Sequence, residues 1–332
     1  MIICGKVEML EMWVLVTGGC GFIGSNIAKR LLERGYNVIV LDNYFLGTRK
    51  NVKILEAQYG DKINVVDGDV RNFELLSSIM RKCDYVIHEA ALSSAPMFNK
   101  DPREGIHVNI CGFANVLELA RRYGVKKVVY ASTSSLYSAF PPPHREDLPV
   151  IPRTYYEYTM FAREHLARIY YETYGLKSVG MRYFSIYGPN ELHKLRFANI
   201  ITQFLWCFLK DKPPIIYGDG SQTRDFTYVD DAAEATILAM ESEDVECEVF
   251  NVGTGVETSF KEIVRILQDT LGKDIEPKYV PNPIKKYVYR TKADTTKIQK
   301  SLGFRATVEV REGIKRVVDI YSRVVDEIPN EW

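Results

Sequence analysis

The amino-acid sequence predicts an α/β protein with a doubly wound parallel sheet of the Rossmann type and a smaller C-terminal lobe that binds substrate. Two observations carry this prediction. A strand pattern, a glycine-rich turn and a helix pattern follow one another near the start of the chain, and short β-branched runs then alternate with helical patterns. At 332 residues, 46% of them hydrophobic, the chain is long enough to bury a large core.

The first element is the apolar run Val14–Val16, which is typical of a buried strand. The glycine turn and the first helical residues follow it: Gly18, Gly21, Phe22, Ile23 and Gly24. A strand, a glycine turn and a helix in this order direct backbone N–H groups and the positive end of the helix dipole toward a pyrophosphate. The alternative is a glycine-rich turn that binds nothing, but the strand before it and the helix after it favour dinucleotide binding.

The second strand, Asn37–Leu41, ends at Asp42, and Asn43 comes next. An acid at this place accepts hydrogen bonds from the ribose hydroxyls of adenosine and repels a 2′-phosphate. The sequence therefore predicts NAD, rather than NADP, as the cofactor.

Further strands and long helices alternate after this unit, as expected for right-handed βαβ units and a sheet covered on both faces. We expect strands at Ile63–Val66, Tyr85–Ile87, Lys127–Ala131 and Ser178–Met181, with helices at Pro102–Tyr123 and Thr154–Tyr174. The alternation of strands and helices becomes less regular beyond Gly188-Pro189. We therefore divide the chain into a dinucleotide-binding domain, residues 13–183 plus about 224–252, and a substrate lobe, about 184–223 plus 253–332.

The composition argues against several classes of partner. Lys+Arg and Asp+Glu are both 43, so the net charge of zero gives no reason to expect nucleic acid or an anionic membrane surface. Six scattered cysteines without a Cys-x-x-Cys pair favour a reduced, cytoplasmic protein without a structural metal site. We expect no membrane-spanning segment and no signal peptide.

Ligands of open parallel sheets bind beyond the carboxyl ends of the strands. That rule adds candidate cofactor contacts: Asp69, Val70, Ala90, Ala91 and Tyr183. Asp69 either pairs with the adenine amino group or caps the next helix. Asn109, in the middle of a helix, is either a buried polar strut or a neighbour of the cofactor. Four successive hydroxyls, Ser132–Ser135, are poor core residues and suit a substrate oxygen.

These features together resemble the extended short-chain dehydrogenase/reductases, and among them the nucleotide-sugar epimerases of the UDP-galactose 4-epimerase type. The resemblance covers nearly the whole chain from Trp13. Its markers include Thr17-Gly-Gly-x-Gly-Phe-Ile-Gly24, Gly68-Asp69-Val70, Ser132-Thr133-Ser-Ser-Leu-Tyr137, Arg182-Tyr183-Phe184, Tyr187-Gly188-Pro189 and Tyr217-Gly-Asp-Gly-x-Gln-Thr-Arg-Asp-Phe226. In such enzymes tightly bound NAD takes a hydride from C4 of a UDP-hexose, and the 4-keto sugar then receives it on the other face.

The resemblance implies a role for each matching residue. Thr133 shares the proton of the C4 hydroxyl, and Tyr156 is the base. Contacts to the UDP-sugar are implied for Ser185, Asn199, Tyr217, Arg224 and Thr291. Tyr217 lies on the uracil and Arg224 clamps the diphosphate, whereas Ser185 replaces the usual asparagine beside the phosphate. Candidates for a second phosphate cation are Lys285, Lys286 and Arg290. A small Thr291, where relatives restricted to non-acetylated hexoses have tyrosine, implies that N-acetylated sugars are accepted. The resemblance also implies a homodimer.

The largest departure from the family is Met160, because the family motif Tyr-x-x-x-Lys reads Tyr156-x-x-x-Met160 here. Without the lysine, no ammonium at position 160 favours the phenolate of Tyr156, and the nicotinamide ribose loses a hydrogen-bond donor. A tyrosine of pKa ~10 is about 0.1% ionised at pH 7, a deficit of up to ~4 kcal/mol. A weak or inactive protein that binds NAD and a UDP-sugar is therefore the alternative to an active epimerase.

The residues after Thr133 distinguish related chemistries. Dehydratases and decarboxylases of the family carry a glutamate there, whereas this chain has Ser134-Ser135. The sequence thus favours 4-epimerisation of UDP-N-acetylglucosamine/UDP-N-acetylgalactosamine or UDP-glucose/UDP-galactose.

Overall fold

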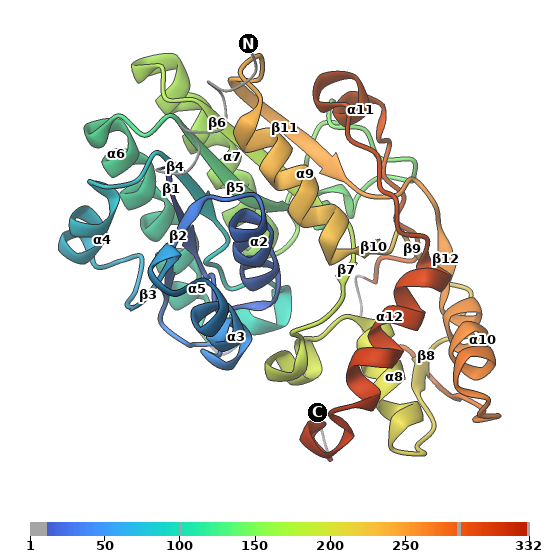
Figure 1. The fold of residues 1–332 in the computed structure, drawn as a ribbon. Helices are drawn as coiled ribbons and strands as arrows, with labels where there is room; N and C mark the ends of the chain where they lie inside the picture. The colour runs from blue at the N-terminus through green and yellow to red at the C-terminus, as the bar shows by residue number, and fades with distance from the viewer. Residues whose placement is uncertain (1–11, 100, 284–286, 331–332) are drawn as a thin grey trace, which may run out of the picture.

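A seven-stranded parallel sheet forms the centre of the protein in the computed structural model, which describes residues 12–99, 101–283 and 287–330 (Figure 1). Its strand order is β11-β6-β5-β4-β1-β2-β3, which confirms the predicted Rossmann arrangement. The strands are β1 (Trp13–Thr17), β2 (Asn37–Asp42), β3 (Ile63–Asp67), β4 (Tyr85–His88), β5 (Lys127–Thr133), β6 (Ser178–Tyr183) and β11 (Cys247–Val252).

The middle strands are buried because helices cover both faces of the sheet. Val14, Leu15 and Val16 of β1 are fully buried, and every residue of β5 and β6 is buried as well. Thr17 at the end of β1 pairs with Leu41 of β2 and His88 of β4. This register aligns the carboxyl ends of the strands, so that the loops after them gather at one edge.

Each face of the sheet has its own layer of helices. The helices α2 (Phe22–Glu33), α3 (Lys50–Tyr59) and α9 (Val229–Glu241) share one hydrophobic cluster, and α2 and α9 lie side by side (Figure 1). On the other face lie α4 (Phe73–Met80), α6 (Phe113–Tyr123) and α7 (Tyr155–Tyr174).

The single helix expected over residues 102–123 is interrupted. The chain forms α5 (Pro102–Ile106), a π-helical turn η4 (His107–Gly112) and then α6. Asn109 lies in this turn, and its backbone carbonyl accepts a hydrogen bond from Nε of Arg163 at 2.8 Å. Such π-helical turns are frequent at functional sites.

A smaller lobe lies at the lower right of Figure 1 and has a hydrophobic core of its own. It contains α8 (Ile200–Leu209), α10 (Phe260–Leu271) and α12 (Val310–Ser322), which pack on one another, and the paired strands β8 (Ile215–Tyr217) and β13 (Lys278–Val280). The buried residues between the three helices include Phe204, Phe208, Ile263, Val317 and Tyr321.

The chain crosses between the lobes at slightly different places from those expected. Residues 224–228 still pair within short two-stranded sheets: β9 (Thr223–Arg224) with β12 (Thr258–Ser259), and β10 (Thr227–Tyr228) with β7 (Ile186–Tyr187). The return to the large sheet begins with α9. Residues 296–302, assigned above to the substrate lobe, form α11 (Thr296–Leu302) and pack against β11 and α9, because Ile298 is fully buried in the core of the large sheet.

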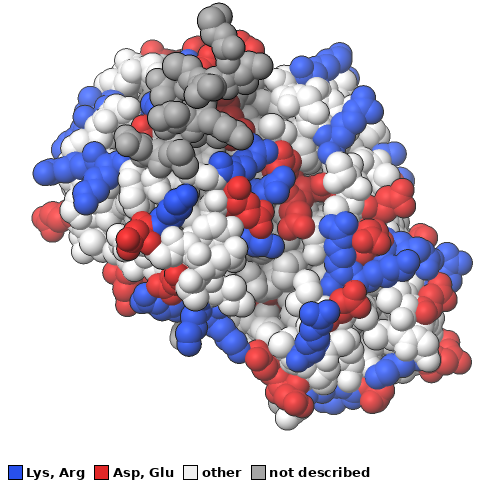
Figure 2. Space-filling view, viewed as in Figure 1, with Lys and Arg blue, Asp and Glu red and all other residues white. Residues whose placement is uncertain are grey.

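Acidic and basic side chains are interspersed over the face shown in Figure 2, as the zero net charge leads one to expect. Within the described ranges, no helix has the length and apolar character needed to cross a bilayer. The same residues contain no group of three or more His, Cys, Asp and Glu side chains placed to hold a metal ion.

Candidate active site

A cavity of about 440 Å³ opens at the carboxyl ends of the central strands, within the ~300–1,000 Å³ typical of small-molecule sites. Most of the residues expected at the cofactor or the sugar line it. They are Gly18, Gly21, Phe22, Ile23, Gly24, Asp42, Asn43, Asp69, Val70, Ala90, Ala91, Thr133, Tyr156, Met160, Tyr183 and Ser185.

The backbone of the glycine turn forms part of the wall of this cavity. Gly18 has a φ of +66°, and a Cβ atom there would lie 2.7 Å from the backbone nitrogen of Ala90. A Cβ at Gly24 would lie 2.3 Å from the carbonyl oxygen of Gly18. Helix α2 starts at Phe22, and its N-cap, Gly21, offers no side chain to the first amide groups. These amides are therefore open to an anion such as the pyrophosphate of NAD, which fits this turn.

Asp42 is held at the end of β2 by backbone donors. Its carboxylate accepts hydrogen bonds from the backbone N–H groups of Cys20 at 2.9 Å and Tyr44 at 2.8 Å. Burial raises the pKa of this carboxyl, and the backbone hydrogen bonds oppose the rise. Each carboxylate oxygen keeps acceptor capacity, which suits a ribose with two hydroxyls.

Asp69 lines the cavity and does not cap the following helix. The N-cap of α4 is Asn72, whose side chain accepts the N–H of Leu75 at 3.1 Å. Asp69 instead forms an ion pair with Arg71 at 2.8 Å, which lowers the pKa of its carboxyl to about 2. The helix-cap interpretation of Asp69 is therefore wrong.

Thr133 and Tyr156 meet at the cavity wall. Thr133 ends β5, and Tyr156 is the second residue of α7, whose N-cap is Thr154. Tyr156 is 7% exposed. Burial raises the pKa of its phenol, whereas the hydroxyl of Thr133 and the guanidinium of Arg163 lower it. A phenol at the first turn of a 20-residue helix also lies near the positive end of the helix dipole.

Met160 lines the cavity one helical turn after Tyr156 and is 2% exposed. Its Sδ lies 3.9 Å from Nδ2 of Asn109. The Asn109 amide also bonds both backbone groups of Leu92 and the hydroxyl of Thr159, at 2.8 to 3.1 Å. Asn109 is fully buried, and it is absent from the cavity lining. These contacts show that Asn109 acts as a buried strut beside the cavity.

The sequence analysis did not single out two charged residues of this region, Arg163 and Glu89. Arg163 is fully buried, and its Nε and Nη2 donate to the carbonyl oxygens of Asn109 and Ala90, both at 2.8 Å. Glu89, directly after β4, lines the cavity and contacts the hydroxyl of Tyr183 at 2.9 Å. The helical period was a usable signal for Arg163, because residues seven apart share one face of a helix. No local pattern marks Glu89.

The expected contacts to the UDP-sugar are only partly gathered here. Ser185 lines the cavity, but Asn199, Tyr217, Arg224 and Thr291 do not. The amide of Asn199 donates to the carbonyls of Ser185 and Ile186 and caps α8, so it acts as a strut.

The remaining three lie in the small lobe or beside it, with other contacts. Tyr217 is 41% exposed on β8. The guanidinium of Arg224 donates to the carbonyls of Thr223 at 2.7 Å and Tyr289 at 3.3 Å. Thr291 is buried, and its hydroxyl accepts the backbone N–H of Asp225 at 3.3 Å.

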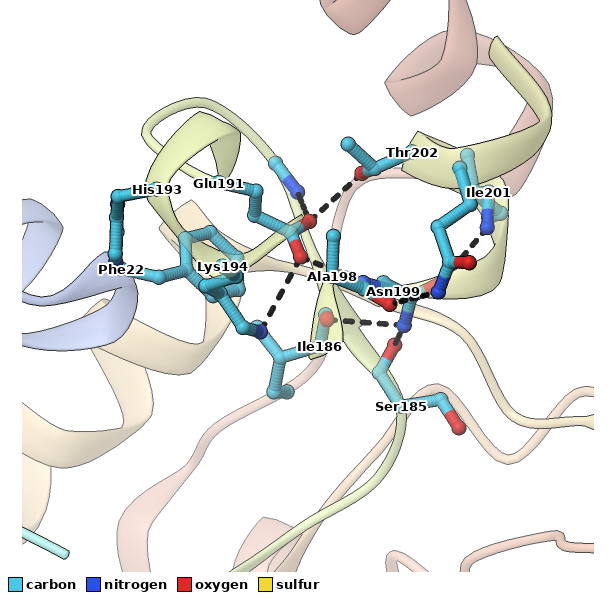
Figure 3. A network of polar contacts seen from close by, with 12 residues as sticks. Phe22, Ser185, Ile186, Glu191, His193, Lys194, Ala198, Asn199, Ile201 and Thr202 are labelled. Atoms are coloured by element: carbon cyan, nitrogen blue, oxygen red, sulfur yellow. Dashed lines mark hydrogen bonds and ion pairs between the residues drawn. The ribbon is translucent and has the colours of Figure 1, made fainter. Parts of the chain in front are cut away.

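The sequence reasoning missed a cation that lines the cavity, Lys194. Its ammonium lies 4.7 Å from the centre of the Phe22 ring and pairs with Glu191 at 3.3 Å (Figure 3). Glu191 is fully buried, and the backbone N–H of Asn199 and the hydroxyl of Thr202 both donate to it at 2.7 Å. This network fixes a positive charge near the start of α2.

The expected second phosphate cations are not placed at the cavity. Arg290 forms an ion pair with Glu257 at 2.6 Å and does not line the cavity. Lys285 and Lys286 lie outside the described residues.

Comparisons with known proteins point to one family of enzymes. Residues 14–253 match the model of the NAD dependent epimerase/dehydratase family. The UDP-glucuronate 4-epimerase of Thermodesulfobacterium geofontis is 35% identical over 314 residues, which cover 92% of this chain and 95% of that protein.

Solved structures of sugar-nucleotide enzymes share the whole fold. The UDP-glucose 4-epimerase of Thermotoga maritima, solved with UDP-glucose, has a TM-score of 0.88 at 32% identity, covering 95% of this chain and 100% of its own. The UDP-N-acetylglucosamine 4-epimerase of Methanobrevibacter ruminantium, in complex with UDP-N-acetylmuramic acid, has a TM-score of 0.88 at 29% identity, covering 95% and 99%. The similarity thus spans both lobes.

Proposed function

Because the chain belongs to the NAD-dependent epimerase/dehydratase family, we propose that it is a UDP-sugar 4-epimerase that uses NAD. The observation that carries the proposal is that Thr133 and Tyr156 line the same cavity as the glycine turn and Asp42. When bound, NAD supplies an acceptor for the hydride at C4 of the sugar. The protein supplies the proton chemistry at the C4 hydroxyl.

Tyr156 is the base in this proposal, and Thr133 shares the proton between the phenol and the sugar oxygen. Thr133 is positioned for this by the N–H of Ser135, which donates to its hydroxyl at 3.1 Å. Because that hydroxyl accepts from the backbone, its own hydrogen is free to point at Tyr156 or the sugar. The base must give up its proton before it can accept another, so the rate follows the ionised fraction of Tyr156.

The names of the relatives support a UDP-sugar as substrate, and experiment must identify the hexose. The relatives act, by their names, on UDP-glucuronate, UDP-glucose and UDP-N-acetylglucosamine. We favour UDP-N-acetylglucosamine/UDP-N-acetylgalactosamine or UDP-glucose/UDP-galactose. Lys194 adds a candidate for the diphosphate cation to Arg224, because it already lies on the cavity wall. If Thr291→Tyr leaves the preference between the two sugars unchanged, Thr291 does not select for the N-acetyl group.

A homodimer is part of the proposal. Helix α7 exposes large apolar and aromatic side chains, including Tyr158 (58%), Ile169 (53%) and Tyr174 (55%). Such side chains favour interfaces, and two copies of α6 and α7 suit a two-fold axis. Light scattering at micromolar concentration tests this, and a monomer mass would contradict it.

The test of activity is incubation with UDP-N-acetylglucosamine or UDP-glucose, followed by NMR detection of the C4 epimer. The matched control is Tyr156→Phe, which keeps the ring and removes the base. We expect epimer from the parent protein and none from the control. Binding of both NAD and a UDP-sugar without any epimer would favour the alternative of an inactive binding protein.

A further inference from the structure

The guanidinium of Arg163 is buried without a carboxylate partner among the described residues. Its Nε and Nη2 bond neutral carbonyls, and its Nη1 has no hydrogen-bond partner there. Burial lowers its pKa to about 10, so it is still a cation at pH 7. A buried charge without a counter-ion costs several kcal/mol, and such groups persist where they serve a site.

The hydrogen-bond network around the nearby acid, Glu89, favours its protonated form, which carries no counter-charge for Arg163. The hydroxyl of Tyr183 lies 2.9 Å from Glu89 and 2.8 Å from the hydroxyl of Thr236, which donates to the carbonyl of Ala232 at 2.8 Å. If Glu89 is ionised, Tyr183 donates to it, and the contact between the hydroxyls of Tyr183 and Thr236 has a hydrogen only if Thr236 stops donating to the carbonyl of Ala232. A protonated Glu89 donates to Tyr183, Tyr183 donates to Thr236, and every contact has its hydrogen. Burial raises the pKa of Glu89 to about 8, against the opposing effects of the hydrogen bond with Tyr183 and the charge of Arg163.

Arg163 lies on the same face of α7 as Tyr156. The two residues are seven apart on α7, so they share a face and their Cα atoms are about 10 Å apart along the axis. Long side chains in helices lean toward the N-terminus, which here is the end that holds Tyr156. Nη2 reaches the carbonyl of Ala90, and Ala90, Met160 and Tyr156 line the same cavity.

We propose that Arg163 supplies the positive charge that favours the phenolate of Tyr156, in place of the lysine that Met160 replaces. This inference rests on the proposed function, in which Tyr156 is the base. Arg163 does not line the cavity, so it acts through Tyr156 as a positioning residue and does not touch the substrate.

The charged and hydrogen-bonding groups that face Tyr156 set the sign of the effect. Thr133 and Arg163 lower its pKa, whereas Glu157 and Glu89 raise it. Of these four groups, Glu89 has the smallest effect. Loss of the Arg163 charge therefore raises the pKa of Tyr156, and each unit means about tenfold less phenolate at pH 7.

The test is to titrate the tyrosines of the NAD-saturated protein by their near-ultraviolet absorbance. Subtracting the titration of the same protein carrying Tyr156→Phe leaves the phenolate signal of Tyr156. Arg163→Gln removes the charge but keeps a donor for the carbonyls, and Arg163→Lys keeps the charge. We expect Arg163→Gln to raise the midpoint by about one pH unit or more and to move the rising limb of the pH–rate profile equally, so that the rate falls about tenfold at pH 7 and recovers at higher pH. Arg163→Lys is expected to stay closer to the parent.

The titration needs no turnover, so it separates this inference from the proposed activity. An absence of epimer in the parent refutes the activity, while the midpoint still reports the effect of Arg163. Unchanged midpoints in a folded Arg163→Gln variant overturn the inference. If that variant does not fold, Met160→Lys/Arg163→Gln is compared with Met160→Lys. A higher midpoint in the double variant supports the inference, and equal midpoints overturn it.

Discussion

Replacing Glu89 by glutamine tests the protonated acid directly. Glutamine has the same shape, and its Nε2 can donate to Tyr183 as the carboxyl O–H does, so the chain through Thr236 to the carbonyl of Ala232 survives. The substitution changes one thing, namely the ability to lose a proton.

The sign of the pH effect follows from the raised pKa. Glu89 has a pKa of about 8 in the folded protein against an ordinary value of 4.5. Between these values the native state holds a proton that the unfolded state has released, so the free energy of unfolding falls as the pH rises. The contribution is fully present below pH 4.5 and fully lost above pH 8. At 1.36 kcal/mol per unit, the loss is about 3–5 kcal/mol, and Glu89→Gln should abolish it.

The assay is urea unfolding of both proteins at pH 5 and pH 9, in the presence of saturating NAD. All other titrating groups are shared, so the difference between the two proteins isolates position 89. At pH 5 we expect the free energies of unfolding to agree within about 1 kcal/mol, and at pH 9 we expect the variant to be more stable by roughly 3 kcal/mol. Parallel pH dependences would refute the reasoning, because they would mean that Glu89 is already ionised at neutral pH.

Three further predictions follow from the same site. The purified protein should release NAD on denaturation, and Asp42→Asn should lower the amount retained; equal amounts would show that Asp42 does not hold the ribose. Glu164→Gln should lower the free energy of unfolding by about 3–5 kcal/mol, because the buried Glu164 bonds Arg182 at 2.6 and 2.8 Å; a change below 1 kcal/mol in denaturant unfolding would contradict this. Met160→Lys should speed epimerisation at pH 7 about tenfold for each unit by which it lowers the pKa of Tyr156; no gain, with an unmoved rising limb, would show that the missing lysine is not limiting.

The parts of the fold that local patterns specify were predictable. Buried runs such as Val14–Val16 and the glycines after them determine strand, turn and helix within a few residues, and the parallel order follows from the alternation. The π-helical turn at Asn109 was not predictable, because what holds it is a hydrogen bond from Arg163, 54 residues away. The packing of Ile298 against the large sheet was not predictable either, because it depends on contacts with segments that are distant in the sequence.

The candidate site likewise contains residues that could be predicted from the sequence and residues that could not. Asp42, Thr133 and Tyr156 come from strand ends and the first turn of a helix, where position in the chain determines position in space. Glu89 and Arg163 acquire their properties from neighbours in other segments, such as Tyr183 and Ala90. A sequence pattern shows that lysine is missing at 160, but only the packed structure shows which other cation stands close.

The position of β11 at the edge of the sheet has a consequence for synthesis on the ribosome. Its partner β6 is complete at Tyr183, yet β11 is made only at residues 247–252, and α11, which covers it, later still. Until β11 has been made, the N–H and C=O groups at the outer edge of β6 are unpaired, and an unpaired edge favours association with other chains. We therefore expect fragments that end between Tyr183 and Cys247 to aggregate, and the large domain to finish folding only after much of the small lobe has emerged.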